Sequence, residues 1–260
     1  MEDRIISYKG NTYGVRDVHK ALLPLLEMFD RHCKKYNIAY SLAYGSLLGC
    51  VRNHGFIPWD DDVDIMMKRS DFEKFLNSFE KKETDLSKNT YLDCPRFLYK
   101  LHNKNVDGNS FFIDIYPADN VPNNVLLEKL KLVLVQLLRQ TIIGRNGRRY
   151  TLIRVLRKII AYSVSFPISK QQLLRIYLYV CSLGNSKESD RICFYCTTNA
   201  SYGRYHSSMI MDNIVYSKFE EIMMPIIERY DAYLTREYGK EYMTPPKESE
   251  RHPLHNIKKK

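Results

Sequence analysis

The sequence of 260 residues lacks an apolar run long enough to cross a bilayer. Its longest stretch without a charged residue, residues 36–51, has only 16 residues and includes glycine and serine, whereas a membrane-spanning helix needs about 20 mostly apolar residues. No apolar segment follows residues 1–4, so we expect no secretory signal. We therefore expect a cytoplasmic protein, either freely soluble or bound peripherally to the cytoplasmic face of the membrane.

Cysteine is sparse, with six residues scattered over the whole chain. Without a secretory signal, such cysteines are expected to be reduced thiols rather than disulfides. Cys193 and Cys196 have the spacing of a zinc-binding pair, but no second close pair accompanies them. Cys181 and His206 would have to complete the site, so we favour ordinary thiols over zinc.

Acidic residues are nearly missing from residues 126–175. This segment has eleven Lys and Arg residues and a single acid, Glu128, and this excess of ten equals the net charge of the whole chain. No recognisable nucleic-acid-binding motif accompanies the charge, so we expect no nucleic-acid partner. Two interpretations remain: helices with solvated basic faces, or an amphipathic contact with an anionic membrane.

The hydrophobic pattern predicts a chain in which helices and strands alternate and then give way to helices alone. Gaps of three or four residues between apolar positions indicate helices, and alternation indicates strands. Pro24 interrupts the first helix, Pro117 is expected to stop the third strand, and Ser70–Glu73 has the pattern of a capping box. Leu130, Leu134, Leu137 and Leu138 form the apolar stripe expected to be buried. Helices are predicted at residues 15–36, 47–53, 70–82, 126–143, 151–164 and 168–183, and strands at residues 38–44, 62–67 and 111–116.

The most informative feature that is present is a cluster of four aspartates, Asp60–Asp62 and Asp64. On an extended strand Asp62 and Asp64 project to the same side, about 7 Å apart along the backbone. Apolar neighbours indicate that this strand is buried, where unpaired carboxylates are costly. Hard oxygen ligands in this arrangement suit Mg²⁺ or Mn²⁺, and Asp114, within another apolar strand, is a third candidate ligand. Asp60 and Asp61 are expected to be solvated or capping residues of the preceding loop.

The order helix, strand, Gly45-Ser46, helix, strand with Asp62 and Asp64, and a later strand with Asp114, resembles the nucleotidyltransferase fold. The whole string of residues 45–64 resembles the signature of the LicD family, which includes bacterial phosphocholine transferases and, more distantly, animal fukutin-related proteins. Residues 112–117 resemble the second acidic strand of that family. The closing motif of that family is resembled by four short segments near the end of this chain: Tyr238-Gly239, Tyr242-Met243, Pro245-Pro246 and His252.

This resemblance implies an α/β (α+β) fold with a nucleotidyltransferase-like core, in which a small mixed sheet is flanked by helices. We expect this core to span residues 1–125, a basic helical insertion to span residues 126–190, and residues 191–260 to complete the catalytic domain. The insertion is expected to govern the choice of acceptor.

The resemblance also implies an enzyme that transfers phosphocholine from CDP-choline to a sugar hydroxyl of a cell-surface glycan or its lipid-linked precursor, releasing CMP. We expect Asp62 and Asp64 to bind Mg²⁺ or Mn²⁺ against the diphosphate. Asp114 would either complete the metal site or accept the proton of the attacking hydroxyl. Gly45 and Ser46 would hold a phosphate at the start of a helix.

Four more residues are candidate substrate contacts. Arg52 and, more weakly, Lys100 are candidate partners of the diphosphate. Trp59 is either a packing residue or a cation–π contact for choline, and His252 is either structural or a substrate contact. A transferase acting on lipid-linked precursors needs membrane access, which favours membrane contact through residues 126–175.

Two other functions stay open at this point. One is a different donor on the same scaffold: a CDP-linked phosphoethanolamine, phosphonate or phospho-polyol, or nucleotidyl transfer from an NTP. The other is a basic membrane- or glycan-binding protein with a vestigial site. The complete set of Gly45, Ser46, Asp62, Asp64 and Asp114 argues against a vestigial site.

Overall fold

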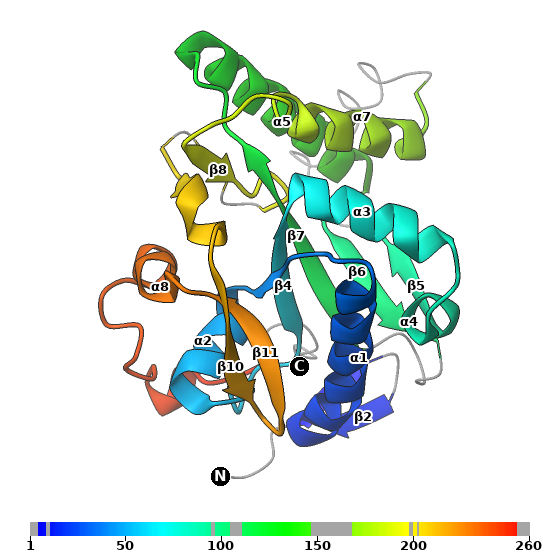
Figure 1. Ribbon diagram of the computed structural model, residues 1–260, viewed down its shortest axis with the longest axis vertical. Coiled ribbons are helices and arrows are strands. Elements are labelled where there is room, and N and C mark those ends of the chain that lie inside the picture. The colour runs from blue at the N-terminus through cyan, green and yellow to red at the C-terminus, as the bar shows by residue number, and fades with distance from the viewer. Residues whose placement is uncertain are drawn as a thin grey trace. The chain divides into compact units, whose positions relative to one another are not determined.

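The computed structural model describes residues 5–8, 11–94, 97–104, 111–146, 168–197, 200–201 and 203–253 (Figure 1). The chain divides into two compact units: unit 1 comprises residues 1–93, 99–116 and 209–260, and unit 2 comprises residues 94–98 and 117–208. The boundaries predicted at residues 126 and 190 both fall within the second segment of unit 2. Among the described helices, none combines the length and the apolarity needed to cross a bilayer.

Unit 1 is built on the sheet path β3-β4-β7-β6-β5, with a separate antiparallel hairpin of β10 and β11. This mixture of strands and helices confirms the predicted α/β class. Its strands are β1 (Ile5–Tyr8), β2 (Asn11–Gly14), β3 (Ser41–Leu42), β4 (Val63–Lys68), β5 (Thr90–Asp93), β6 (Tyr99–Asn103), the first part of β7 (Phe112–Asn120), β10 (Ile214–Phe219) and β11 (Ile222–Ile227). Its helices are α1 (Val15–Lys35), α2 (Tyr44–Asn53), α3 (Arg69–Glu80), α4 (Asp85–Asn89), α8 (Tyr230–Tyr238) and the short 3-10 helix η2 (Glu248–Glu250).

Helix α1 confirms the longest predicted helix and continues through Pro24. Its apolar residues recur at helical spacing, and Leu22, Leu25 and Phe29 are fully buried. The Phe29 ring packs against Phe75 of α3, with 5.3 Å between the ring centroids. Figure 1 shows α1 and α3 in front of the sheet. This packing covers the strand that carries the acidic residues.

Helix α3 begins at Arg69, and the predicted capping box at Ser70–Glu73 is wrong. The N-cap residue is Lys68, which has no side-chain acceptor for a capping hydrogen bond. Strand β4 runs directly into the helix, so Ser70 already lies within the first turn. The Asp71 carboxylate instead accepts hydrogen bonds from the Ala39 backbone N–H (3.3 Å) and from Lys74 (3.0 Å).

Strand β7 continues past Pro117, which was expected to end it. Residues 112–115 pair with β6, and the strand pairs again, with β8 (Arg191–Cys193), at Asp119 and Asn120. Pro117 lies between these two paired stretches. A proline is tolerated in a strand where its position needs no ladder N–H.

Unit 2 consists of α5 (Val125–Asn146), α7 (Lys170–Ser182) and the short strands β8 and β9 (His206–Ser207), with the 3-10 helix η1 (Ser208–Met211) at its boundary. The helix predicted at residues 151–164 lies outside the described residues. Helix α7 begins with a capping box in which Ser169 and Gln172 exchange side-chain-to-backbone hydrogen bonds. The core of unit 2 includes Leu132, Val135, Tyr177 and Tyr195.

Helix α5 faces the opposite way from the prediction. Leu130, Leu134 and Leu137 of the predicted buried stripe are 52%, 37% and 60% exposed. The buried face instead carries Glu128, Lys131 and Arg139 among apolar residues, each at most 6% exposed. These buried charges are compatible with the interior because backbone carbonyls and an ion pair satisfy them. The partners are the carbonyls of Asn120 and Leu183 for Lys131, the carbonyls of Tyr195 and Thr197 for Arg139, and Arg191 and the Tyr205 hydroxyl for Glu128.

Candidate metal and active site

The structure brings Asp62, Asp64 and Asp114 together at the start of strand β4 and in the first part of β7. All three are buried, and one carboxylate oxygen from each lies within 4.8 Å of the others. Within the described part of the chain this is the one cluster of three acidic, histidine or cysteine side chains close enough to hold a metal ion. Three buried carboxylate oxygens fit the preference of Mg²⁺ and Mn²⁺ for hard oxygen ligands.

Helix α2 is attached to this cluster by two backbone hydrogen bonds. The Ala43 N–H donates to the Asp64 carbonyl, and the Asp64 N–H donates to the Ser46 hydroxyl oxygen, both at 2.9 Å. Tyr44, the first residue of the helix, has a φ of 39°, which is strained for a residue with a side chain. The start of α2, where unpaired N–H groups favour an anion, is therefore fixed beside the carboxylates.

Gly45 is required at the first turn of α2 by the closeness of Asp60. A Cβ atom at residue 45 would lie 2.5 Å from Asp60 Oδ2 and 3.9 Å from Asp64 Oδ2. A distance of 2.5 Å is well inside van der Waals contact, so a larger residue would displace the Asp60 carboxylate. The buried Ser46 holds Asp64, because its hydroxyl oxygen accepts the Asp64 N–H.

Burial and like charge make the ionised cluster unfavourable without a cation. The pKa of Asp64 is raised well above its usual range, first by burial and then by the charges of Asp62, Asp114 and Asp60. A hydrogen bond from Tyr116 opposes this rise in the pKa. A divalent ion would neutralise the repulsion that raises the pKa, so the donor set fits such an ion.

Lys100 forms an ion pair with Asp114. Strand register places the two residues opposite each other, and the Lys100 ammonium lies 2.5 and 2.8 Å from the two carboxylate oxygens of Asp114. The same ammonium lies 3.5 Å from the centroid of the Phe112 ring. Lys100 therefore supports an ionised Asp114, and any contact with a substrate phosphate would be shared with this carboxylate.

Residues 54–62, which we call the acidic loop, are held by two residues that could not be identified from the sequence. His19 of α1 donates a hydrogen bond to the Asp60 carbonyl (2.8 Å) and stacks on the Phe56 ring. Glu220, at the tip of the β10–β11 hairpin, accepts the Phe56 N–H (2.9 Å) and donates its own backbone N–H to the His54 carbonyl (2.8 Å). The His19 contact spans 41 positions of sequence, and the Glu220 contacts span 164 or more. No local sequence pattern could reveal partners so far apart.

Asp61 corrects another expectation. It was expected to be a solvated loop residue but is 1% exposed. The cluster thus brings a fourth carboxylate out of water, which strengthens the case that this loop is built around positive charge.

An aromatic group surrounds the start of α2. The Tyr44 ring lies 4.8 Å from the Tyr116 ring and 5.8 Å from the Tyr233 ring, measured between centroids. The pKa of Tyr238 at the end of α8 is raised by burial and by the charges of Asp64, Asp60 and Asp62. Helix α8 and the residues after it, which carry the predicted closing motif, therefore come close to the carboxylates.

The other candidate substrate residues are brought together only in part. Arg52 donates to the Tyr242 carbonyl (3.3 Å), and its guanidinium carbon lies 5.8 Å from the centroid of the Trp59 ring. Arg251, which the sequence analysis did not single out, lies 5.2 Å from the same centroid. His252 is exposed. Two positive charges over the Trp59 ring oppose the binding of choline there.

The six cysteines are free thiols, and four of them are buried. Among the described residues, Cys181, Cys193, Cys196 and His206 do not form a cluster close enough to share a metal ion. Burial and the nearby Asp119 raise the pKa of Cys193 to about 12, so this sulfur is held as a neutral thiol rather than as a zinc-binding thiolate.

Comparison with known proteins agrees with this geometry. Residues 37–131, which contain all three clustered aspartates, match the protein family described as "LicD/FKTN/FKRP, nucleotidyltransferase domain". This part of the chain is similar to the nucleotidyltransferase domain of that family. The chain is 27% identical over 260 aligned residues to the "Lipopolysaccharide cholinephosphotransferase LicD" of Haemophilus influenzae, covering 93% of this chain and 96% of that protein.

Two uncharacterised Rickettsia proteins are similar to a smaller part of this chain. The Rickettsia prowazekii protein RP689 is 35% identical over 111 residues, which are 38% of this chain and 41% of that protein. The Rickettsia typhi protein RT0683 is 32% identical over 115 residues, which are 42% of this chain and 37% of that protein.

Proposed function

We propose that this transferase moves phosphocholine from CDP-choline to a sugar hydroxyl of a cell-surface glycan or its lipid-linked precursor, releasing CMP. The observation that carries the proposal is the buried cluster of Asp62, Asp64 and Asp114. The Haemophilus relative, a lipopolysaccharide cholinephosphotransferase that aligns over nearly its whole length, supports the choice of head group and glycan acceptor.

The cluster fits a mechanism in which Asp62 and Asp64 hold a divalent ion. When bound, such an ion would neutralise the negative charge that develops on the phosphate of the departing CMP. The N–H groups of Gly45 and Ser46 at the start of α2 bind a phosphate oxygen and orient the donor. Phosphoryl transfer depends mainly on such positioning and charge stabilisation.

Asp114 has two roles open to it in this mechanism. Its buried carboxylate is close enough to Asp62 and Asp64 to be a third ligand. Alternatively it accepts the proton of the attacking sugar hydroxyl, and then the nearby Lys100 ammonium (2.5 Å) keeps it ionised before the transfer.

The tyrosines beside α2 suit the quaternary ammonium of choline. Tyr44 and Tyr116 are each half-buried, and their rings lie close together beside the first turn of α2, where Gly45 and Ser46 would bind a phosphate. A quaternary ammonium has no N–H to donate and is bound best by aromatic faces. The same rings would give CDP-ethanolamine a weaker contact, because a primary ammonium loses more hydration on entering such a site.

Ligand-induced stabilisation separates this proposal from other donors. Melting temperatures would be measured with CDP-choline, CDP-ethanolamine, CDP-ribitol, CTP and ATP, each with and without Mg²⁺. A ligand that binds the folded state raises the melting temperature, by an amount that grows with its concentration over Kd. We expect the largest Mg²⁺-dependent rise with CDP-choline. A rise with CTP or ATP but not with any CDP-alcohol would replace this proposal with nucleotidyl transfer.

We also propose that unit 2 contacts an anionic membrane surface through the outer face of α5. Leu126, Leu130, Val133 and Leu137 recur at helical spacing on that face and are all at least 51% exposed. Leu and Val are under-represented among the residues that dominate protein–protein interfaces. The single acid of the helix, Glu128, is buried against Arg191 and so leaves the outer face without negative charge.

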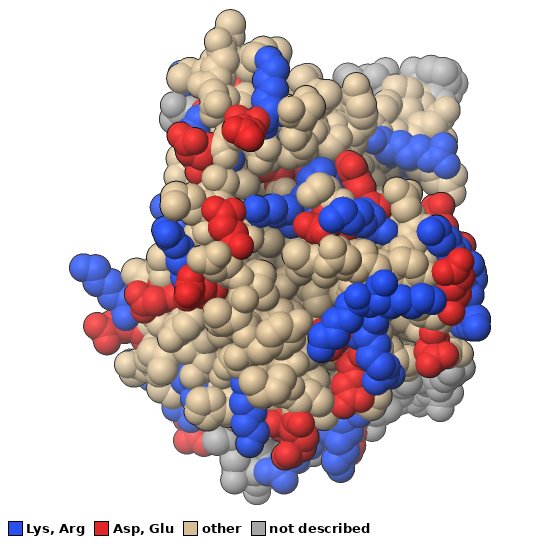
Figure 2. Space-filling model, viewed as in Figure 1, with Lys and Arg blue, Asp and Glu red and all other residues tan. Residues whose placement is uncertain are grey.

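The charge of the region complements acidic lipids. The sequence of residues 126–175 has a net charge of +10. Lys131 and Arg139 are buried, so the remaining basic residues would supply the attraction to anionic headgroups. On the molecular face drawn in Figure 2, basic and acidic side chains are interspersed rather than segregated.

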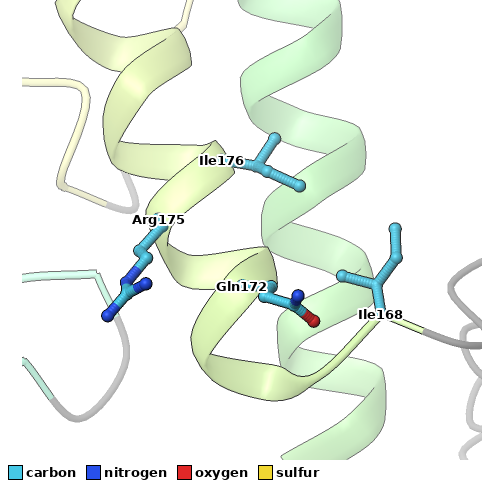
Figure 3. Close-up of a pocket in the computed structure, with 4 residues that line it drawn as sticks. All are labelled: Ile168, Gln172, Arg175 and Ile176. Carbon is cyan, nitrogen blue, oxygen red and sulfur yellow. The ribbon is translucent and has the colours of Figure 1, made fainter.

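Helix α7 adds a smaller apolar feature to unit 2. An open groove of about 360 Å³ is lined by Ile168, Gln172, Arg175 and Ile176. Figure 3 shows Ile168, Gln172 and Ile176 on the side of α7 nearer α5, with Arg175 pointing away. The groove contains no acidic side chain, so it belongs to the apolar and basic surface rather than to the metal site.

A further inference from the structure

Two arginines that are distant in sequence meet over the single tryptophan of the chain. Trp59 precedes Asp60 in the acidic loop, Arg52 lies in the last turn of α2, and Arg251 follows η2. The guanidinium carbons lie 5.8 Å (Arg52) and 5.2 Å (Arg251) from the centroid of the Trp59 ring. Arginines stack on an indole in this way when the ring fixes the plane of the guanidinium.

The positive charge of this group is not neutralised by protein carboxylates. Arg52 donates to Asn53 Oδ1 (3.0 Å) and to the Tyr242 carbonyl (3.3 Å), and Arg251 donates to the Pro246 carbonyl (2.8 Å). Within the described ranges neither guanidinium makes an ion pair. Each has five N–H donors, so most donors remain available for a ligand.

The two charges also repel each other. Burial lowers the pKa of Arg52, and the charge of Arg251 lowers it further. A bound dianion would remove this repulsion and accept hydrogen bonds from both groups, which is the arrangement in which arginine binds phosphate best.

The group is joined to the metal cluster through the acidic loop and through helix α2. Trp59 is the neighbour of Asp60 in sequence, and Asp60 Oδ2 lies against Gly45 in the first turn of α2. Arg52 lies in the last turn of the same helix, whose Ser46 hydroxyl accepts the Asp64 N–H.

From these observations we infer that Arg52, Arg251 and Trp59 form a second phosphate-binding subsite. It binds the phosphate of the cytidine nucleotide both in the CDP-linked donor and in the CMP that the transfer produces. The inference rests on the proposed use of a CDP-linked donor. In this division the carboxylates hold the metal, and the two arginines hold the nucleotide phosphate directly. Arg251 thereby brings the segment after α8 into the binding site.

Trp59 provides the direct measurement, because it is the single tryptophan of the chain. CMP would be titrated against the full-length protein in EDTA, with Trp59 fluorescence followed and calorimetry as a second readout. We expect CMP to change the fluorescence saturably. Arg251→Ala should raise the Kd for CMP about tenfold, since a charge-assisted hydrogen bond contributes about that factor, and Arg251→Lys should restore part of the affinity.

The matched control is Arg31→Ala. Arg31 is a solvent-exposed arginine of α1 that pairs with Glu27 of the same helix, so this variant should bind CMP like the wild type. In steady-state assays with CDP-choline, Arg251→Ala should raise KM about tenfold and leave kcat within about threefold. Equal CMP affinity in the wild type and Arg251→Ala, with both folded, would overturn the subsite.

Failure of the subsite and failure of the proposed function give different results. Arg251-dependent binding of CMP without any phosphocholine transfer would leave the subsite standing and remove the choline donor. Transfer from CDP-choline with a KM unaffected by Arg251→Ala would support the choline donor and would overturn the subsite. Binding of inorganic pyrophosphate but not CMP would assign the two arginines to a different phosphate ligand and would overturn the inference.

Discussion

At the residue scale, Asp64 combines an unfavourable environment with a proposed catalytic role. Its pKa is raised by burial and by three neighbouring carboxylates. We predict that Asp64→Asn lowers transferase activity at least about 100-fold, because even residues that only support a metal ligand contribute 10- to 100-fold. The same change should raise the metal-free free energy of unfolding by about 1 kcal/mol, because it removes one buried like charge. Activity assays and urea unfolding measure the two effects.

Asp30→Asn is the control for this prediction. Asp30 is also a buried aspartate of unit 1, but it pairs with Lys34 at 2.6 Å and accepts a hydrogen bond from Tyr40. Its substitution should lower stability and leave the affinity for Mg²⁺ unchanged. A loss of stability in Asp64→Asn equal to that in Asp30→Asn would contradict the metal assignment.

His32 predicts a pH dependence of stability. Its Nε2 lies 2.9 Å from the Ser78 hydroxyl and its Nδ1 lies 2.7 Å from the Thr84 hydroxyl. A hydroxyl can donate or accept, so both partners suit the neutral ring. Burial and the charge of Lys35 lower the pKa of His32 from 6.5 to about 4.

The unfolded chain therefore binds the proton more tightly than the folded one, and the free energy of unfolding should fall as the pH falls from about 6.5 to about 4. We expect a loss on the order of 1 kcal/mol over this range. In His32→Gln the slope of stability against pH should be shallower in this range. Urea unfolding at several pH values measures it, and equal slopes in the two proteins would refute the prediction.

At the element scale, α5 predicts membrane binding. Leu130 and Leu137 are exposed on its outer face, so replacing both with Ser should change the free energy of unfolding by less than about 0.5 kcal/mol. Binding to vesicles that contain phosphatidylglycerol should weaken at least tenfold, because each leucine contributes about 1 kcal/mol or more at an apolar surface. Sedimentation with vesicles, at low and high salt, measures this binding.

The control for α5 replaces Met223 and Met243 with Ser, two exposed apolar residues of unit 1. This variant should bind the vesicles like the wild type. Salt should weaken the binding, since attraction to acidic lipids is screened. Absence of binding would refute the membrane contact, and a dimer that the α5 substitutions dissociate would assign this face to a second copy of the chain.

Helix α5 also shows where prediction of elements from sequence stops. Its existence followed from periodicity, and the leucine stripe at helical spacing was expected to be the buried face. Lys131 and Arg139 are buried because carbonyls from separate segments surround them. Those carbonyls come together only in the folded unit, so the sequence pattern could not reveal them.

At the scale of the whole molecule, the α/β class followed from the family resemblance. Charge in apolar strands made Asp62, Asp64 and Asp114 candidate ligands of one metal ion, and the structure brings them together. The predicted turn at Gly45 also lies beside this cluster. The supports of the site did not follow, because His19, Glu220 and Arg251 reach it from distant elements. Local patterns specify elements and their faces, whereas partners separated by 164 positions depend on the complete fold.

The order of segments has a consequence for synthesis of the protein. Residues 117–208 of unit 2 leave the ribosome before the β10–β11 hairpin, α8 and Arg251 of unit 1. Domains generally fold as their residues emerge, so unit 2 can form while the acidic loop still lacks Glu220. The nascent chain therefore gains its arginine pair and the final support of its carboxylates last. If the proposed subsite binds nucleotide, a ribosome-bound intermediate would not yet do so.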